Sequence, residues 1–108
     1  MENTHRESLR KNWIFLIDNI EVDELLDHLY GESVFTQDMC EQIKAQTTRK
    51  DQVTHLLFTL QRRGPLAFSK FLAGLEATSQ KFIADKLTQT VSELEPNRNL
   101  QHSQPMQL

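Results

Sequence analysis

Apolar residues recur every three or four positions through most of this chain, and this spacing does most to limit the folds available to it. The period is that of an α-helix with one buried face, whereas a half-buried strand would alternate at every second residue. Only three glycines and three prolines occur among the 108 residues. No period-two segment of convincing length is present, so the sequence predicts helices joined by short loops.

Six helical segments follow from the apolar spacing and from signals at helix ends. They cover about residues 4–21, 23–30, 36–46 and 48–62, a segment that starts at Pro65, and residues 79–93. Thr4 with Glu7, and Thr48 with Asp51, have the spacing of a capping box, and Thr36 can cap the third segment. Gly31 is expected just past the end of the second segment as a stop signal.

Helices of two to four turns with short connections can bury their apolar stripes only as a compact antiparallel bundle. Ile14 and Phe15 widen the stripe of the first helix, which indicates a helix that bends or is contacted from two sides. Phenylalanines at helical spacing are interpreted as core residues, although Trp13 and Phe58 belong to stripes too wide for one face and partial exposure stays open for them; the set is Phe15, Phe58, Phe68, Phe71 and Phe82.

The chain is long enough for one domain, which we place at residues 1–94. From Glu95 the composition changes to Pro, Asn, Gln, Ser and His, so residues 95–108 are predicted to be a disordered polar tail. A net charge of -3 and a pI of about 5.8 argue against nucleic-acid binding. The sequence has no apolar run long enough for a membrane span, no signal-peptide pattern and a single cysteine, Cys40, so we expect a cytoplasmic protein.

The residues that could support catalysis or metal binding share no recognisable spacing: Cys40, His5, His28, His55 and His102. Zinc sites use closely spaced pairs of ligands, and phosphate loops need clustered glycines; neither pattern occurs. Cys40 falls on the apolar face of a short helix and is expected to be a packed thiol. The sequence predicts no catalytic residue, no metal and no cofactor.

Charge is unevenly distributed along the chain. From Asp18 to Glu41 there are acidic residues and no Lys or Arg: Asp18, Glu21, Asp23, Glu24, Asp27, Glu32, Asp38 and Glu41. From Lys44 to Lys70 the charged residues are basic except for Asp51. Further positive charge lies at Arg6, Arg10 and Lys11. Ordinary solvated faces are one interpretation. The other interpretation is that the basic face of one copy binds the acidic face of another, head to tail, so that the copies form an open stack.

Several segments resemble a known family. They are residues 9–12 (Leu-Arg-Lys-Asn), residues 24–29 (Glu-Leu-Leu-Asp-His-Leu), and Arg62, Arg63, Gly64 and Pro65 followed by Ala67, Phe68 and Phe71. Together with the succession of six helices, they resemble a caspase recruitment domain, most closely the prodomain of an initiator caspase of the caspase-2 or apoptosome type. The resemblance implies a death fold: a six-helix antiparallel Greek-key bundle with a bent first helix. It also implies homotypic binding to a recruitment domain of an adaptor or an initiator caspase.

In the apoptosome type, basic residues of the first and fourth helices meet acidic residues of the partner's second and third helices. Here the basic set would be Arg10, Lys11, Arg49 and Lys50, and the acidic set Asp23, Glu24 and Asp27, to which the acidic run adds Glu32, Asp38 and Glu41. Trp13 and Thr54 stand where that type carries further basic residues, which favours a caspase-2-like partner such as its adaptor.

Alternative functions remain at this point. The protease motif Gln-Ala-Cys-Arg-Gly is absent, so the chain is expected not to be an enzyme. A decoy made of a recruitment domain alone, which blocks caspase or inflammatory assembly, would use the same faces as an activator. A helix-turn-helix DNA-binding domain is more remote, because the second and third helices are acidic.

Overall fold

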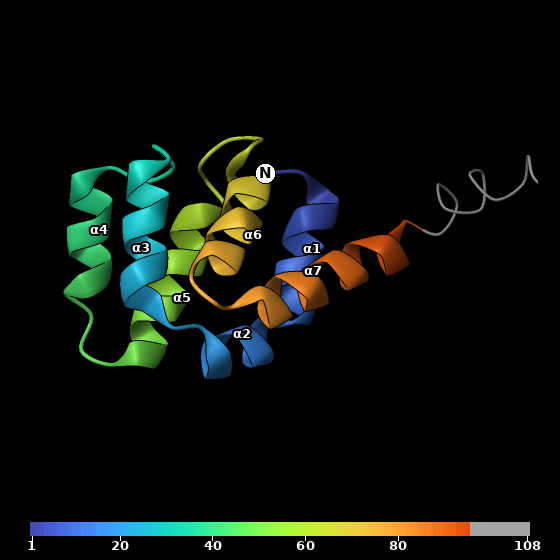
Figure 1. Ribbon diagram of the computed structural model, residues 1–108, viewed down its shortest axis with the longest axis horizontal. Helices are drawn as coiled ribbons and strands as arrows, with labels where there is room; N and C mark the ends of the chain where they lie inside the picture. Colours follow the sequence, from blue (N-terminus) through green and yellow to red (C-terminus); the bar gives the residue numbers. More distant parts are fainter. Residues whose placement is uncertain (96–108) are drawn as a thin grey trace, which may run out of the picture.

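The computed structural model describes residues 1–95, whose regular structure consists of seven α-helices (Figure 1). They are α1 (Asn3–Lys11), α2 (Trp13–Asn19), α3 (Val22–Gly31), α4 (Gln37–Lys44), α5 (Arg49–Leu60), α6 (Ala67–Ala77) and α7 (Lys81–Leu94). In Figure 1, α3 and α4 lie at one end of the bundle and α1 and α7 at the other. The predicted all-α class is confirmed. The predicted tail, residues 95–108, lies outside the described residues except for Glu95.

The predicted first helix is broken at Asn12, which raises the number of helices from six to seven among the described residues. Asn12 has φ -104° and ψ 17°, outside helical geometry. Its buried side chain donates to the Ser8 carbonyl and to Thr90 Oγ1, both at 2.9 Å, while Ser8 Oγ donates to the Leu87 carbonyl at 2.9 Å. The break therefore lies where α1 is fastened to α7, and the expected bend is confirmed.

Two of the predicted helix caps are present and one is not. Thr36 Oγ1 accepts from the Met39 amide at 3.2 Å, and Thr48 Oγ1 accepts from the Asp51 amide at 3.1 Å. The capping box of Thr4 and Glu7 is wrong, because α1 begins earlier, at Asn3, after an N-cap residue that makes no side-chain cap. The Glu7 carboxylate is instead held by a charged partner, Arg10.

The predicted stop at Gly31 is also wrong, since α3 includes this residue. The left-handed residue of the turn is Ser33, with φ 62°. The amides of Val34 and Phe35 both donate to the Leu29 carbonyl, at 2.9 and 3.3 Å, and both side chains are buried. The chain after α3 therefore folds back over the C-terminal end of this helix, and the side chains of Val34 and Phe35 are buried there.

One core contains the buried stripes of all seven helices in the described range. Its largest fully buried side chains are Phe71, Leu9, Leu16, Ile20, Leu25, Leu26, Leu29, Ile43, Leu56, Leu57, Leu60 and Leu75. Phe68 is buried as predicted, but Phe82 is 55% exposed and the prediction that it faces inward is wrong. The buried face of α7 is formed by Ile83, Ala84 and Leu87, which leaves Phe82 at the edge of this face. The Phe82 ring packs edge-on against the Phe15 ring, with 6.2 Å between the ring centroids.

We predict opposite effects for two glycine-to-alanine substitutions in this bundle. At Gly74, where α6 meets α3, an added Cβ would lie 2.9 Å from Leu25 Cδ1 and 3.0 Å from His28 Cδ2, so Gly74→Ala should destabilise by about 1–3 kcal/mol. At Gly31 nothing lies within 4 Å, so Gly31→Ala should stabilise by about 0.4–1 kcal/mol. Urea unfolding measures both; equal effects would contradict this packing.

Candidate functional site

The predicted basic residues of the first helix, Arg10 and Lys11, are exposed in the last turn of α1. The Arg10 guanidinium contacts both carboxylate oxygens of Glu7, through Nη2 at 2.7 Å and Nε at 3.1 Å. This hydrogen bonding lowers the pKa of Glu7 and raises the pKa of Arg10. Exposed pairs of this kind contribute little to stability, so Arg10 remains available to a carboxylate on a partner.

The other two predicted basic residues, Arg49 and Lys50, lie in the first turn of α5 and have different environments. The half-buried Arg49 donates from Nη1 to the carbonyls of Ile17 and Ile20, at 3.0 and 2.9 Å, and from Nη2 to that of Asp18 at 3.3 Å. It thereby satisfies carbonyl groups that the end of α2 leaves without helical partners. Lys50 Nζ lies 3.5 Å from Asp18 Oδ1 and is well exposed.

An aromatic pair separates these two basic regions. Trp13 of α2 and Phe58 of α5 have ring centroids 5.1 Å apart at an angle of 50°, and Phe58 is 53% exposed. Beside the pair lies a hollow of about 480 Å³ lined by Arg6, Glu7, Arg10 and Gln61. Thr54, one turn before Phe58 on α5, donates its hydroxyl to the Lys50 carbonyl at 2.9 Å. The predicted basic face is therefore two positive regions with an apolar centre.

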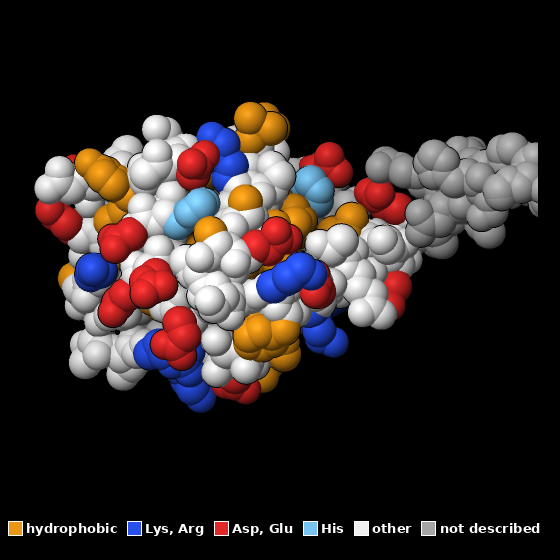
Figure 2. All heavy atoms as spheres, in the orientation of Figure 1, with side chains coloured by type: hydrophobic (Ala, Val, Ile, Leu, Met, Phe, Trp, Pro, Cys, Tyr) orange, Lys and Arg blue, Asp and Glu red, His pale blue; other side chains and the backbone are white. Residues whose placement is uncertain are grey.

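Part of the predicted acidic set gathers along a groove between α3 and α4. Asp27 and Glu41 line this groove, which has a volume of about 680 Å³; the other lining residues are Leu26, Tyr30, Gln37, Cys40, Lys44 and Ala45. Figure 2 shows acidic side chains gathered over the end of the bundle where α3 and α4 lie. Tyr30, which the charge pattern did not single out as a site residue, is 52% exposed.

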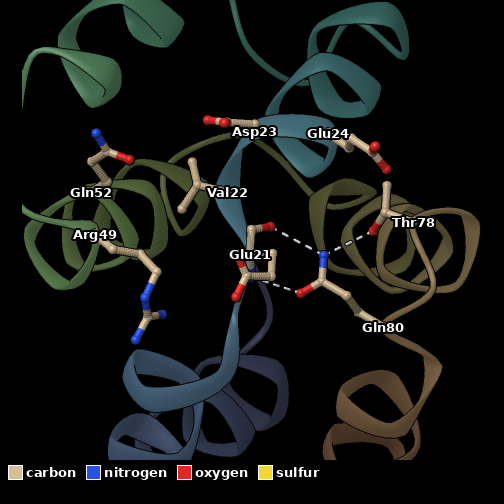
Figure 3. A pocket seen from close by; sticks show the side chains of 8 residues that line it. All are labelled: Glu21, Val22, Asp23, Glu24, Arg49, Gln52, Thr78 and Gln80. Atoms are coloured by element: carbon tan, nitrogen blue, oxygen red, sulfur yellow. Dashed lines mark hydrogen bonds between the residues drawn. The ribbon is translucent and has the colours of Figure 1, made fainter.

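Asp23 and Glu24 lie elsewhere, in a hollow of about 620 Å³ at the junction of α2 and α3, which Arg49 also lines (Figure 3). The junction is tied to the turn before α7 by the buried side chain of Gln80. Gln80 Oε1 accepts from the Glu21 amide at 2.8 Å, and Nε2 donates to the Glu21 carbonyl at 3.1 Å and to Thr78 Oγ1 at 2.9 Å. Acidic residues and Arg49 therefore line the same hollow, although the Arg49 guanidinium points away from Asp23 and Glu24 (Figure 3).

Two further predicted acidic residues are also not brought to the α3–α4 groove. Asp38 of α4 lines a separate hollow with Arg62 and Arg63. Glu32 follows α3, and its carbonyl accepts from Lys70 Nζ at 3.1 Å. The acidic residues thus cover α3 and α4 as several small clusters, because residues about one turn apart on the same helix border different hollows.

The described residues show no arrangement suited to metal or nucleophilic chemistry. No group of three or more His, Cys, Asp or Glu side chains within residues 1–95 could hold a metal ion. The Cys40 thiol is half-buried, and this burial, with Asp27 nearby, raises its pKa, so the thiol stays protonated at neutral pH. None of the helices in the described range is long and apolar enough to cross a membrane.

We predict that Arg49 and Lys50 differ in their contribution to stability although they are adjacent. Arg49→Ala removes three contacts to carbonyls at the end of α2 and should lower the free energy of unfolding by about 1–2 kcal/mol. Lys50→Ala removes one exposed ion pair and should change it by less than about 0.5 kcal/mol. Chemical denaturation of both variants tests this, and equal losses would show that the Arg49 contacts do not hold α2.

Comparison with known proteins gives matches over most of the chain. A family model, "Caspase recruitment domain", matches residues 6–90. The chain is 34% identical over 94 residues to caspase-2 of Gallus gallus, covering 87% of this chain and 22% of that protein. It is 33% identical over 89 residues to caspase-9 of Homo sapiens, covering 81% of this chain and 21% of that protein.

A third relative is apoptotic protease-activating factor 1 of Danio rerio, 30% identical over 96 residues, which are 89% of this chain and 8% of that protein. The chain thus spans about a fifth of the length of the caspases that it matches. The family match covers the helices from within α1 to within α7, and the broken first helix and all-α bundle agree with it. This chain belongs to the caspase recruitment domain family, whose all-α death fold serves homotypic protein interaction in apoptotic signalling.

Proposed function

We propose that this chain is a non-catalytic module that recruits or regulates an initiator caspase by docking onto a second recruitment domain. Residues 1–94 would form this domain, acting in the cytoplasm. The observation that carries the proposal is the placement of opposite charge on separate helices: Arg10, Lys11 and Lys50 on α1 and α5, and Asp23, Glu24, Asp27 and Glu41 on α3 and α4. Each face can meet its opposite on a partner of the same fold.

Charge suits a recruitment contact because it acts before the surfaces touch. Complementary potentials increase the rate of encounter and penalise wrong partners, while adding less to final affinity. The basic residues Arg10 and Lys50 already hold exposed intramolecular partners, Glu7 and Asp18. Such pairs are weak, so exchanging them for carboxylates on a partner costs little.

The positions at which this chain lacks charge favour one kind of partner. Trp13 and Thr54 occupy positions between the two basic regions, so a partner that needs continuous positive charge there is disfavoured. This supports a partner of the caspase-2 type, such as the adaptor that recruits that caspase, over the apoptosome scaffold. The same two faces support head-to-tail association between copies of this chain, because each copy carries both.

A charge-reversal experiment tests this function. We expect Arg10→Glu with Lys50→Glu to weaken binding to a recruitment domain of the caspase-2 type by at least about tenfold, or 1.4 kcal/mol, because like charges would face each other. Binding of the unaltered chain should also weaken as salt rises. Surface plasmon resonance against immobilised recruitment domains measures both effects.

The matched control reverses the same number of charges on α7, with Lys81→Glu and Lys86→Glu, because α7 carries none of the residues of the proposed faces. This control should bind like the unaltered chain. Unchanged binding by the variant that carries Arg10→Glu and Lys50→Glu would contradict docking through the basic face. An equal loss of binding in this variant and in the control would contradict it as well.

A further inference from the structure

Two serine side chains within residues 1–95 are exposed and have a hydroxyl without a hydrogen-bond partner, those of Ser33 and Ser79. The hydroxyls of Ser8 and Ser69 donate to backbone carbonyls, and Ser92 also has a partner. Ser33 follows α3 and Ser79 follows α6, and both have left-handed backbone, with φ 62° and 65°. Because their backbone settings match, the two serines differ mainly in the side chains around them.

Two cationic side chains from distant parts of the chain are bound to the residues on either side of Ser33. Lys70 Nζ of α6 donates to the Glu32 carbonyl at 3.1 Å. Arg63 Nε, from the connection between α5 and α6, donates to the Val34 carbonyl at 2.9 Å. In Figure 1 this connection and the turn after α3 lie at the same, upper side of the bundle. Ser33 is therefore flanked by two positive charges that the fold holds in place.

Both cations keep hydrogen-bond donors that these backbone contacts do not use. A guanidinium has five N–H donors and an ammonium has three. Within residues 1–95, Arg63 and Lys70 each make one side-chain hydrogen bond and no ion pair. A negatively charged group attached to the Ser33 oxygen would therefore find unused donors on two sides.

We propose that Ser33 is a phosphorylation site and that Arg63 and Lys70 hold the phosphate. The co-reactants are ATP and a serine/threonine protein kinase. The Ser33 oxygen forms a bond to the γ-phosphorus, the bond from that phosphorus to the bridging oxygen of the β-phosphate breaks, ADP leaves, and the hydroxyl proton passes to the kinase. The product carries a charge of about -1.5 to -2 at pH 7 and three strong acceptor oxygens, which suit donors from an arginine and a lysine.

The phosphate strengthens a connection that the fold already contains. The turn around Ser33 joins α3 to α4, whereas Arg63 and Lys70 belong to the connection after α5 and to α6. Glu32, the preceding residue, is acidic and opposes the added charge, so both cations are needed to hold the phosphate. Modification thus changes how firmly α3 and α4 are tied to the rest of the bundle, and this effect does not depend on the proposed function.

Mass spectrometry after incubation with a kinase source tests whether the site is used. The full chain is incubated with ATP and cytosol of vertebrate cells, together with a standard kinase substrate as a positive control. We expect a phosphopeptide with the phosphate on Ser33, which Ser33→Ala removes. Unmodified Ser33 in a reaction that phosphorylates the control substrate would overturn the site.

Phosphoserine incorporated at position 33 by an expanded genetic code tests what holds the phosphate, without a kinase. We expect the equilibrium constant for unfolding in urea to fall at least about fivefold, because charge-assisted contacts form at a partly exposed site. The second pKa of the phosphate, ordinarily about 6, should also fall in phosphorus NMR titrations, because nearby cations favour its dianion. Phosphoserine at position 79 is the matched control and should show neither change, since Lys81 nearby is already paired with Asp85 at 3.0 Å.

Removing the two cations identifies the groups that act. With Arg63→Gln and Lys70→Gln, phosphoserine at position 33 should change neither the unfolding constant nor the phosphate pKa. With Arg62→Gln, which removes an exposed arginine whose guanidinium has no partner within residues 1–95, both changes should persist. Each variant is compared with and without phosphate, so an effect of the substitution itself on folding cancels. Equal behaviour at positions 33 and 79, or changes that survive the loss of both cations, would overturn the proposal.

Discussion

The break at Asn12 is the constraint on which the arrangement of this bundle depends. A straight first helix could follow either α7 or α5, but not both. The Asn12 amide and the Ser8 hydroxyl fasten α1 to α7, and beyond the break α2 turns onto α5, where Arg49 holds its terminal carbonyls. Because of the break, Arg10 and Trp13 lie beside the C-terminal part of α5, near Phe58. Lys50 lies in the first turn of the same helix.

We propose that charge and apolar surface have separate tasks in this molecule. Arg10 and Lys50 sit in exposed, readily exchanged ion pairs, which suits them to guide a partner by long-range attraction. Arg49, although it belongs to the same sequence cluster, directs its hydrogen bonds to the carbonyls at the end of α2. Trp13 and Phe58 place an apolar centre between the positive regions, as the residues of strong interfaces are arranged.

Much of the fold could be predicted from the sequence, because the helical period and the threonine caps at Thr36 and Thr48 are local signals. The predictions for Phe82 and for the Thr4–Glu7 capping box were wrong because of interactions that the local pattern does not include. The burial of α7 is decided by the elements it packs on, and Arg10 holds Glu7. The charged residues could be identified from the sequence, but their grouping in space could not. Asp38 and Asp27 line different hollows. The α3–α4 groove, which Asp27 lines, exists only where these two helices pack together.

We propose that recognition uses the basic face on α1 and α5 and the acidic face on α3 and α4, and that it leaves α7 free. Nuclear magnetic resonance of the isotope-labelled chain, titrated with an unlabelled recruitment domain of the caspase-2 or apoptosome type, tests it most directly. We expect amide shift changes around Arg10, Lys50 and Phe58, or around Asp27 and Glu41, with little change on the exposed side of α7. Changes centred on α7, with both charged faces undisturbed, would contradict the claim.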